Sequence, residues 1–137
     1  MPGQPGGGVV TPHDAVRALL QRYARAVDQR DIDALVGLFH PQAEIAGALG
    51  VQSVGEWLET MRAPRTFPSS MHMIGEPLIT LEEGSAEATV DTYAVVYQLG
   101  DEGSGDLTLG IRYLDDVVLH QGRWLFRRRT SQTVWMR

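Results

Sequence analysis

The chain has 137 residues, which is enough for one domain and too few for two of ordinary size. Its net charge of −5 argues against nucleic acid as a partner, because binding to phosphates depends on basic patches. It contains no cysteine, which excludes disulfides and thiolate metal sites. No segment is apolar over the length of a membrane span, and the Gly/Pro-rich start lacks the features of a signal peptide. We therefore expect a cytoplasmic protein with a flexible N-terminal tail over residues 1–10 and one domain over residues 11–137.

Three helices are predicted in the N-terminal half. The first begins at Thr11, whose hydroxyl suits the N-cap position, and its apolar residues recur at helical spacing as far as Val27. A second, short helix is predicted over residues 32–39 and ends before Pro41. A third is predicted over residues 53–61.

The remainder of the chain is predicted to form strands. A short strand lies around residues 44–45, and four long strands separated by Gly-rich or acidic turns follow the third helix: residues 70–80, 85–99, 107–120 and 123–135. Neighbours joined by turns give a mostly antiparallel sheet, and helices followed by strands are typical of an α+β fold. The strands are long enough for a strongly curved sheet whose concave face the helices close.

Four segments, in their order and spacing, resemble the SnoaL-like branch of the nuclear-transport-factor-2-like superfamily. They are an Asp-terminated helix followed by Asp-x-Asp and Leu-Phe (residues 19–39), a His-Met-Ile-Gly strand start (72–75), a Tyr-x-Asp strand (110–116) and a Gly-x-Trp strand start (122–124). The resemblance implies a cone-shaped α+β barrel in which three N-terminal helices pack on a curved, mostly antiparallel sheet. The superfamily includes dehydratases, isomerases, polyketide cyclases and epoxide hydrolases, but also non-catalytic subunits, so the fold alone settles no function.

The resemblance singles out Asp28 and His72. In the dehydratases and the dehydrochlorinase of the superfamily, an Asp at the end of the first helix orients a His on the first long strand, and the His removes a proton from the substrate. An Asp that holds one imidazole nitrogen fixes the tautomer and leaves the other nitrogen free as a base. Two plainer roles stay open: Asp28 can cap the second helix, and His72 can be an ordinary, partly buried histidine.

Tyr23 and Asp115 are the further catalytic candidates. The resemblance to ketosteroid isomerase gives Tyr23 the role of stabilising an oxyanion, and gives Asp115 the role of an acid that works protonated. The alternatives are a core tyrosine and a carboxylate at a strand edge. Residues 46–48, Ala-Gly-Ala, stand where the isomerase has its base, which argues against isomerisation by that base. Arg112 with Asp115 resembles part of the acid-arginine set of the epoxide hydrolases.

Apolar and aromatic residues are expected to line a hydrophobic pocket in the cone. Such residues belong to a core more often than to a ligand site, but as a set they suggest a hydrophobic guest with few polar groups. The expected lining residues are Trp57, Met61, Phe67, Met73, Tyr93, Tyr113 and Trp135.

These observations favour a cofactor-independent acid/base enzyme, a lyase or isomerase of the dehydratase or cyclase type, acting on a small hydrophobic, polyketide-like substrate. His72 is the expected general base and Asp28 orients it. The alternative is a non-catalytic ligand-binding or subunit-type module. The sequence has no phosphate-binding loop, nucleophile elbow or metal-ligand cluster, so we expect no cofactor and no metal. Neither nucleic acid nor membrane is an expected partner, whereas the resemblance implies a homodimer or higher homo-oligomer that uses the outer face of the sheet.

Overall fold

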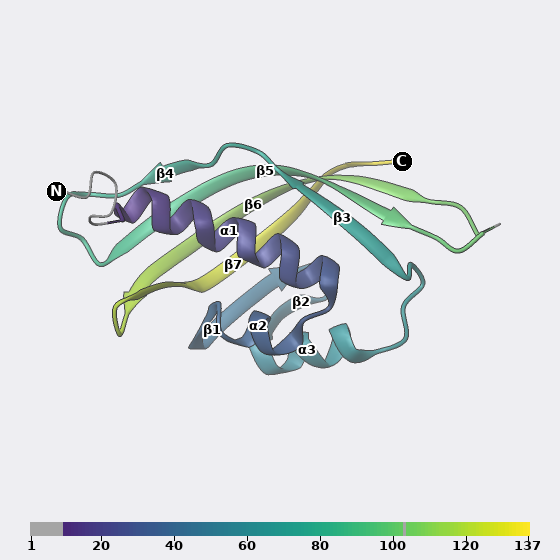
Figure 1. Ribbon diagram of the computed structural model, residues 1–137, viewed down its shortest axis with the longest axis horizontal. Helices are drawn as coiled ribbons and strands as arrows, with labels where there is room; N and C mark the ends of the chain where they lie inside the picture. The colour runs from purple at the N-terminus through teal and green to yellow at the C-terminus, as the bar shows by residue number, and fades with distance from the viewer. Residues whose placement is uncertain (1–9, 103) are drawn as a thin grey trace, which may run out of the picture.

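The computed structural model describes residues 10–102 and 104–137. A long curved sheet forms an arch, and the helices lie on its concave side (Figure 1). The tail expected over residues 1–10 lies outside the described residues, except for Val10. Among the described residues, every helix is too short or too polar to span a bilayer.

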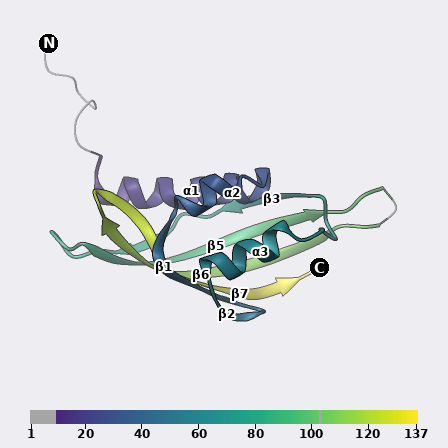
Figure 2. The same cartoon turned by 90° about the horizontal axis from the view of Figure 1, so that it is seen from below.

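Three helices cover the concave face. α1 (Pro12–Gln29) begins at Thr11, whose side chain accepts a hydrogen bond from the Asp14 N–H, and it buries an apolar stripe that includes Tyr23. The one-turn helix α2 is Ile32–Val36. α3 (Val54–Arg62) begins with a capping box in which Ser53 and Glu56 satisfy each other's backbone N–H groups. From below, α1 lies alongside β3 and α3 lies in front of the central strands (Figure 2).

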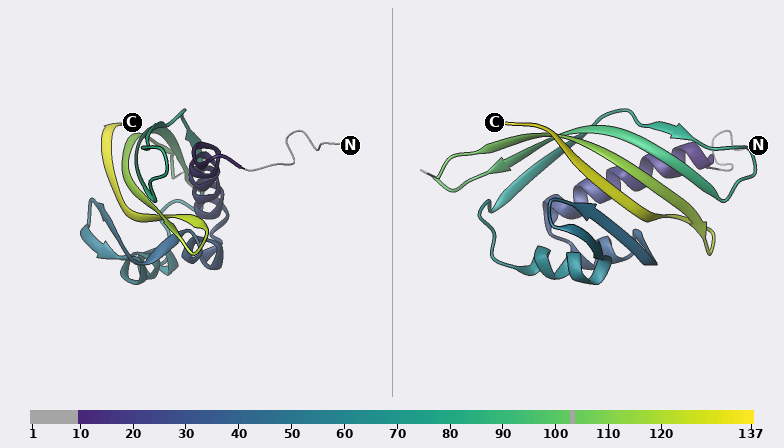
Figure 3. Two further views of the ribbon diagram at one scale, coloured as in Figure 1. Left: turned by 90° about the vertical axis from the view of Figure 1, so that its left-hand side faces the viewer. Right: turned by 180° about the vertical axis from the view of Figure 1, so that it is seen from behind.

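The sheet has seven strands in the order β2-β1-β7-β6-β5-β3, and β4 also pairs with β5. All neighbours are antiparallel except β1 and β7, which are parallel. The strands are β1 (Phe39–Gly47), β2 (Gly50–Ser53), β3 (Ser69–Ile74), β4 (Leu78–Thr80), β5 (Glu87–Leu99), β6 (Leu107–His120) and β7 (Arg123–Met136). The α+β fold with three helices on a curved, mostly antiparallel sheet is confirmed, and the end-on view shows its curvature (Figure 3, left).

Two predicted boundaries are wrong. The second helix ends at Val36 instead of residue 39, because Phe39 already pairs with Phe126 in the parallel ladder and β1 runs for nine residues. The predicted strand over residues 70–80 divides into β3 and β4. Its backbone leaves the regular ladder at Gly75, whose N–H donates to the carbonyl of Tyr93 at 2.8 Å, and Pro77 has no N–H to contribute.

The pleat of the strands decides which side chains face the helices. In β3, exposed and half-buried residues alternate, so that Ser70, His72 and Ile74 face the concave side while Met71 and Met73 face outward. In β5 the buried residue Thr92 faces inward and its neighbour Tyr93 faces outward. The inward side chains of β3 therefore meet the end of α1, and this meeting builds the site described next.

Candidate functional site

The end of α1 and the start of β3 bring Asp28 and His72 into contact. Asp28 Oδ1 lies 2.6 Å from His72 Nδ1, and Asp28 Oδ2 accepts a hydrogen bond of 2.8 Å from the His72 backbone N–H. The Ser70 hydroxyl donates to Asp28 Oδ1 at 2.8 Å, an interaction that the sequence did not suggest. Three donors therefore hold the Asp28 carboxylate, although Asp28 and His72 are 44 residues apart in the sequence. This is the contact expected from the sequence.

The contact fixes the state of the imidazole. Because a carboxylate only accepts hydrogen bonds, Nδ1 of His72 carries the proton and Nε2 keeps its lone pair. Burial lowers the pKa of His72 below its ordinary value, while Asp28 acts in the opposite direction and Arg129 and Arg30 add to the lowering. The ring is therefore neutral near pH 7 and is suited to accept a proton.

A buried ion pair lies deeper under the arch. Arg129 Nε and Asp115 Oδ1 are 3.0 Å apart, and both side chains are almost fully buried. The distance is that of an ion pair, although the approach is not aligned as a hydrogen bond, so both groups keep capacity for another partner. Burial raises the pKa of Asp115 to about 6, against the opposing effect of Arg129. The sequence predicted an inward Asp115 but did not identify Arg129.

Tyr23 connects the two pairs. Its ring lies edge-on to His72 with centroids 6.5 Å apart, and the Arg129 guanidinium lies 4.2 Å from its centroid. The same guanidinium lies 3.7 Å from the ring of Tyr113 and 4.6 Å from that of Phe126. Burial raises the pKa of Tyr23, so its hydroxyl stays protonated and can donate a hydrogen bond.

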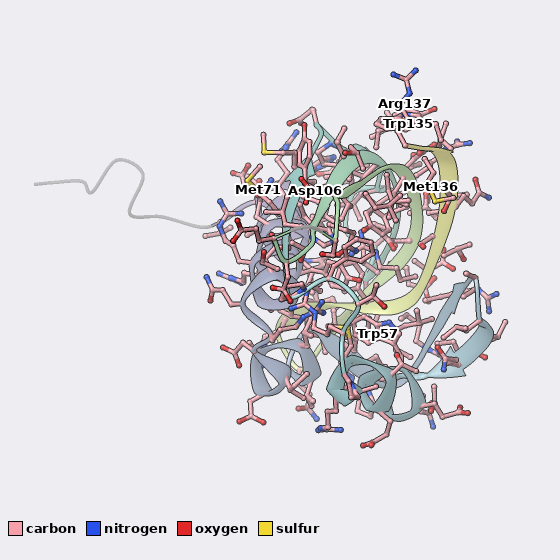
Figure 4. The ribbon with its side chains drawn as sticks, turned by 90° about the vertical axis from the view of Figure 1, so that its right-hand side faces the viewer. Trp57, Met71, Asp106, Trp135, Met136 and Arg137 are labelled. Carbon is pink, nitrogen blue, oxygen red and sulfur yellow. The ribbon has the colours of Figure 1, made fainter. Side chains whose placement is uncertain are left out.

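The structure divides the residues expected to line the pocket into two groups. Trp57 stacks on Tyr23 at 6.1 Å, Met61 packs at the edge of the core, Tyr113 is buried against Arg129, and Phe67 is half-buried between α3 and β3. Met73, Tyr93 and Trp135 lie on the outer face, so the expectation that they share a space with His72 is wrong. Figure 4 shows Trp57 under the arch and Trp135 near the far end of β7.

The pleat explains this error. Met73 and Tyr93 are 55% and 63% exposed because each follows an inward residue on its strand. Trp135 covers Gly110 from outside, where a Cβ on Gly110 would overlap the indole. The loose resemblance of Arg112 and Asp115 to an epoxide-hydrolase set finds no counterpart in the structure, because Arg112 faces outward and forms an ion pair with Asp91.

An apolar hollow lies on the outer face of the sheet. It has a volume of about 380 Å³, and its walls include Gly75, Tyr93 and Trp135. The side chains of His72 and Asp28 are 7% and 20% exposed. His72 is therefore enclosed by its neighbours, which the non-catalytic alternative expects, whereas the 2.6 Å contact to Asp28 is what the enzyme hypothesis expects.

Comparisons with known proteins agree with this architecture. The putative scytalone dehydratase of Novosphingobium aromaticivorans superposes with a TM-score of 0.81 at 21% identity, over 90% of this chain and 84% of that one. A hexachlorocyclohexane dehydrochlorinase (LinA type 2) gives 0.80 at 13%, over 90% and 85%. A nuclear-transport-factor-2-like protein of Salmonella enterica gives 0.77 at 14%, over 88% and 89%. At these identities the similarity is one of fold.

Two sequence comparisons go further than the fold. Uncharacterised proteins of Mycobacterium bovis and Mycobacterium tuberculosis are 30% identical over 122 residues, which is 85% of this chain and 81% of theirs. The SnoaL-like domain profile matches residues 9–130. The chain belongs to the SnoaL-like family.

Proposed function

We propose that this protein is a cofactor-independent acid/base enzyme of the lyase or isomerase class, a dehydratase or cyclase acting on a small hydrophobic substrate. The single observation that supports it most is the 2.6 Å contact between Asp28 and the buried side chain of His72. Two structural neighbours of the same fold are named as a putative scytalone dehydratase and a hexachlorocyclohexane dehydrochlorinase, which are names of lyases. Those names belong to distant proteins and support only the class of reaction.

The proposed chemistry begins at His72. Its Nε2 lone pair takes a proton from a carbon of the substrate, and Asp28 stabilises the imidazolium that forms. The electron pair of the broken C–H bond moves either to an adjacent carbonyl oxygen or to expel a leaving group on the next carbon. The oxygen or leaving group gains negative charge, which Arg129 stabilises.

The buried ion pair with Asp115 favours a functional role for Arg129. A buried ion pair is on average no more stabilising than well-packed apolar residues of the same volume, so stability alone gives little reason for one. The Arg129 guanidinium packs against the rings of Tyr23, Tyr113 and Phe126. The ring of Tyr23 also contacts His72 edge-on. We propose that Arg129 is placed for developing negative charge.

Proton abstraction can be tested before the natural substrate is known. Hydrogen–deuterium exchange at the carbon next to the carbonyl of 1-indanone, followed by NMR in D₂O, reports the base directly. We expect His72→Ala to lower the catalysed exchange by about 10²-fold or more, and Asp28→Asn to lower it substantially. His40→Gln, at a half-buried histidine that faces His120, is the matched control.

The enclosure of His72 favours a second candidate, a non-catalytic binding or subunit-type module. Exchange no faster than in buffer across a panel of mono- and bicyclic ketones supports that module. Equal exchange by the wild type and His72→Ala rules out His72 as the base.

A further inference from the structure

Two arginines lie near the Asp28–His72 pair. Arg30 is the C-cap residue of α1, two positions after Asp28. Arg65 lies in the connection between α3 and β3, and its Nη1 donates to the Pro68 carbonyl at 2.7 Å. In Figure 1 the end of α1 and this connection lie on the right-hand side, the side that faces the viewer in Figure 4.

Neither guanidinium has satisfied its donors. Nε of Arg30, and Nε and Nη2 of Arg65, are buried without a hydrogen-bond partner. Arg30 Nη1 meets only the Met61 sulfur, at 3.3 Å, and a thioether is a weak acceptor. Buried donors of this kind are uncommon because each one loses its hydrogen bonds to water without replacement.

No carboxylate neutralises either arginine at close range. Among the described residues, neither Arg30 nor Arg65 lies within 4.0 Å of an Asp or Glu oxygen, and residues 1–9 and 103 contain no acidic side chain. Burial lowers the pKa of Arg30 and the neighbouring Arg65 lowers it further, against the opposing effect of Asp28. Such a pair is stabilised by an anion placed between its members.

The charges along the whole site lead to the same conclusion. Arg30, Arg65 and Arg129 contribute three positive charges, whereas Asp28 and Asp115 contribute two negative ones. The site therefore has an excess of one positive charge inside a protein whose net charge is −5. A single negative charge restores balance, which fits a carboxylate better than a phosphate dianion.

The backbone of Arg30 adds an independent observation. It adopts φ 55° and ψ 38°, the left-handed conformation in which glycine is favoured at a helix C-cap. An arginine there is disfavoured for the backbone, so the fold offers no local reason for this side chain.

We propose that Arg30 and Arg65 bind the carboxylate of a small hydrophobic substrate, so that this site takes aromatic or polycyclic monocarboxylates. That the bound molecule is a substrate rests on the proposed function. The planar guanidinium groups suit a carboxylate, and the ring system then lies toward Trp57 and Tyr23. Anchoring the charged end at Arg30 and Arg65 places a carbon further along the substrate toward His72.

The test compares two ligands of the same shape that differ in charge. Isothermal titration calorimetry with 2-naphthoate and its neutral counterpart 2-naphthamide measures the preference for the anion. We expect the wild type to bind the naphthoate about tenfold more tightly or better. Arg30→Gln and Arg65→Gln, which keep most of the side chain but not the charge, should each remove most of that preference.

Arg62→Gln is the matched control, because Arg62 is three residues from Arg65, exposed and paired with Glu59. It should keep the full preference, and circular dichroism should show all variants folded. Equal affinity for the two ligands, binding of neither, or a preference that survives both Gln substitutions overturns the proposal. Competition by inorganic phosphate as strong as that by the naphthoate also overturns the assignment to carboxylates. Because no turnover is measured, a negative result here is separate from a negative result in the exchange assay.

Discussion

At the scale of single residues, the pH dependence of activity depends on His72. Burial lowers its pKa, so the neutral, basic form persists to a lower pH than in a free histidine. We expect kcat/KM to be level near pH 7 and to fall on the acid side with a midpoint below about 6.5. A midpoint above 6.5 contradicts the assignment of His72 as the buried base.

Asp115 complicates this profile, because its pKa of about 6 lies in the same range. The two groups then titrate together and the acid limb reports both of them. Asp115→Asn removes one of them, so its acid limb should reduce to the single titration of His72. If the limb keeps its shape in this variant, Asp115 does not take part in the protonation that controls activity.

Ser70 is a positioning residue. Its hydroxyl donates to Asp28 Oδ1, the oxygen that also contacts His72. Loss of one such hydrogen bond costs about 1 kcal/mol, so Ser70→Ala should lower kcat roughly fivefold. It should also raise the pKa of His72, because Asp28 then has one donor fewer competing for its charge. Ser70→Thr keeps the hydroxyl and should restore both values, whereas an unchanged acid limb in Ser70→Ala leaves Ser70 with a structural role only.

The residues of the site differ in how far the sequence predicts them. The contact between Asp28 and His72 was expected from the family resemblance, and the structure places His72 at the second inward position of β3, beside the end of α1. Arg129 does not follow. A β-bulge shifts the register between β6 and β7 so that Val117 pairs with Phe126 but Asp116 pairs with Arg128. Simple alternation along β7 places Phe126 and Arg129 on opposite faces of the sheet. The extra residue of the bulge in β7 turns both side chains toward the concave face, where they are buried.

At the scale of elements, the end of α1 combines a strained cap with the proposed binding of an anion. Arg30→Gly relieves a left-handed conformation that costs a non-glycine residue about 1 kcal/mol, which should raise Tm by roughly 3 °C. The same substitution should abolish the preference for 2-naphthoate. Differential scanning calorimetry and the titration described above measure the two effects.

Gln121 provides a control for this prediction. It has φ 51° in the turn between β6 and β7, far along the sheet from Arg30. Gln121→Gly should give a similar gain in Tm and leave ligand binding unchanged. A loss of stability in Arg30→Gly alone indicates that the Arg30 side chain is retained for its packing against Met61.

Element boundaries were less predictable than element types. The periodicity that predicted a helix through residue 39 is equally compatible with a turn followed by a strand, and only the distant partner Phe126 decides between them. Likewise, the break at Gly75 depends on its bond to Tyr93. Both features are set by contacts across the sheet, which a local pattern does not contain.

At the scale of the whole molecule, the outer face of the sheet carries an unusual number of exposed apolar side chains. They come from β3, β5 and β7: Met71, Met73, Tyr93, Tyr97, Val134 and Trp135. Together with the hollow beside Gly110 they form an apolar surface of the kind that binds another protein. We propose that its occupant is a second copy of this chain.

The charges on this face support a two-fold arrangement. Arg112 and Asp91 form an ion pair there, and Arg112 also lies 5.9 Å from the ring of Tyr93. A symmetric interface brings the same patch against itself, so a patch that contains both signs at its centre can match each charge with an opposite one. This makes self-association better suited to the face than a partner of uniform charge.

Sedimentation equilibrium should therefore show twice the monomer mass of 15.1 kDa at micromolar concentration. Met73→Lys places a charge in the centre of the apolar face and should give the monomer, because the buried lysine has no partner. Leu49→Lys is the control: Leu49 is also apolar and is more exposed than Met73, but it lies in the turn between β1 and β2, and the variant should stay dimeric. A wild type that sediments as a monomer, or a Met73→Lys variant that remains a dimer, excludes this face as the interface.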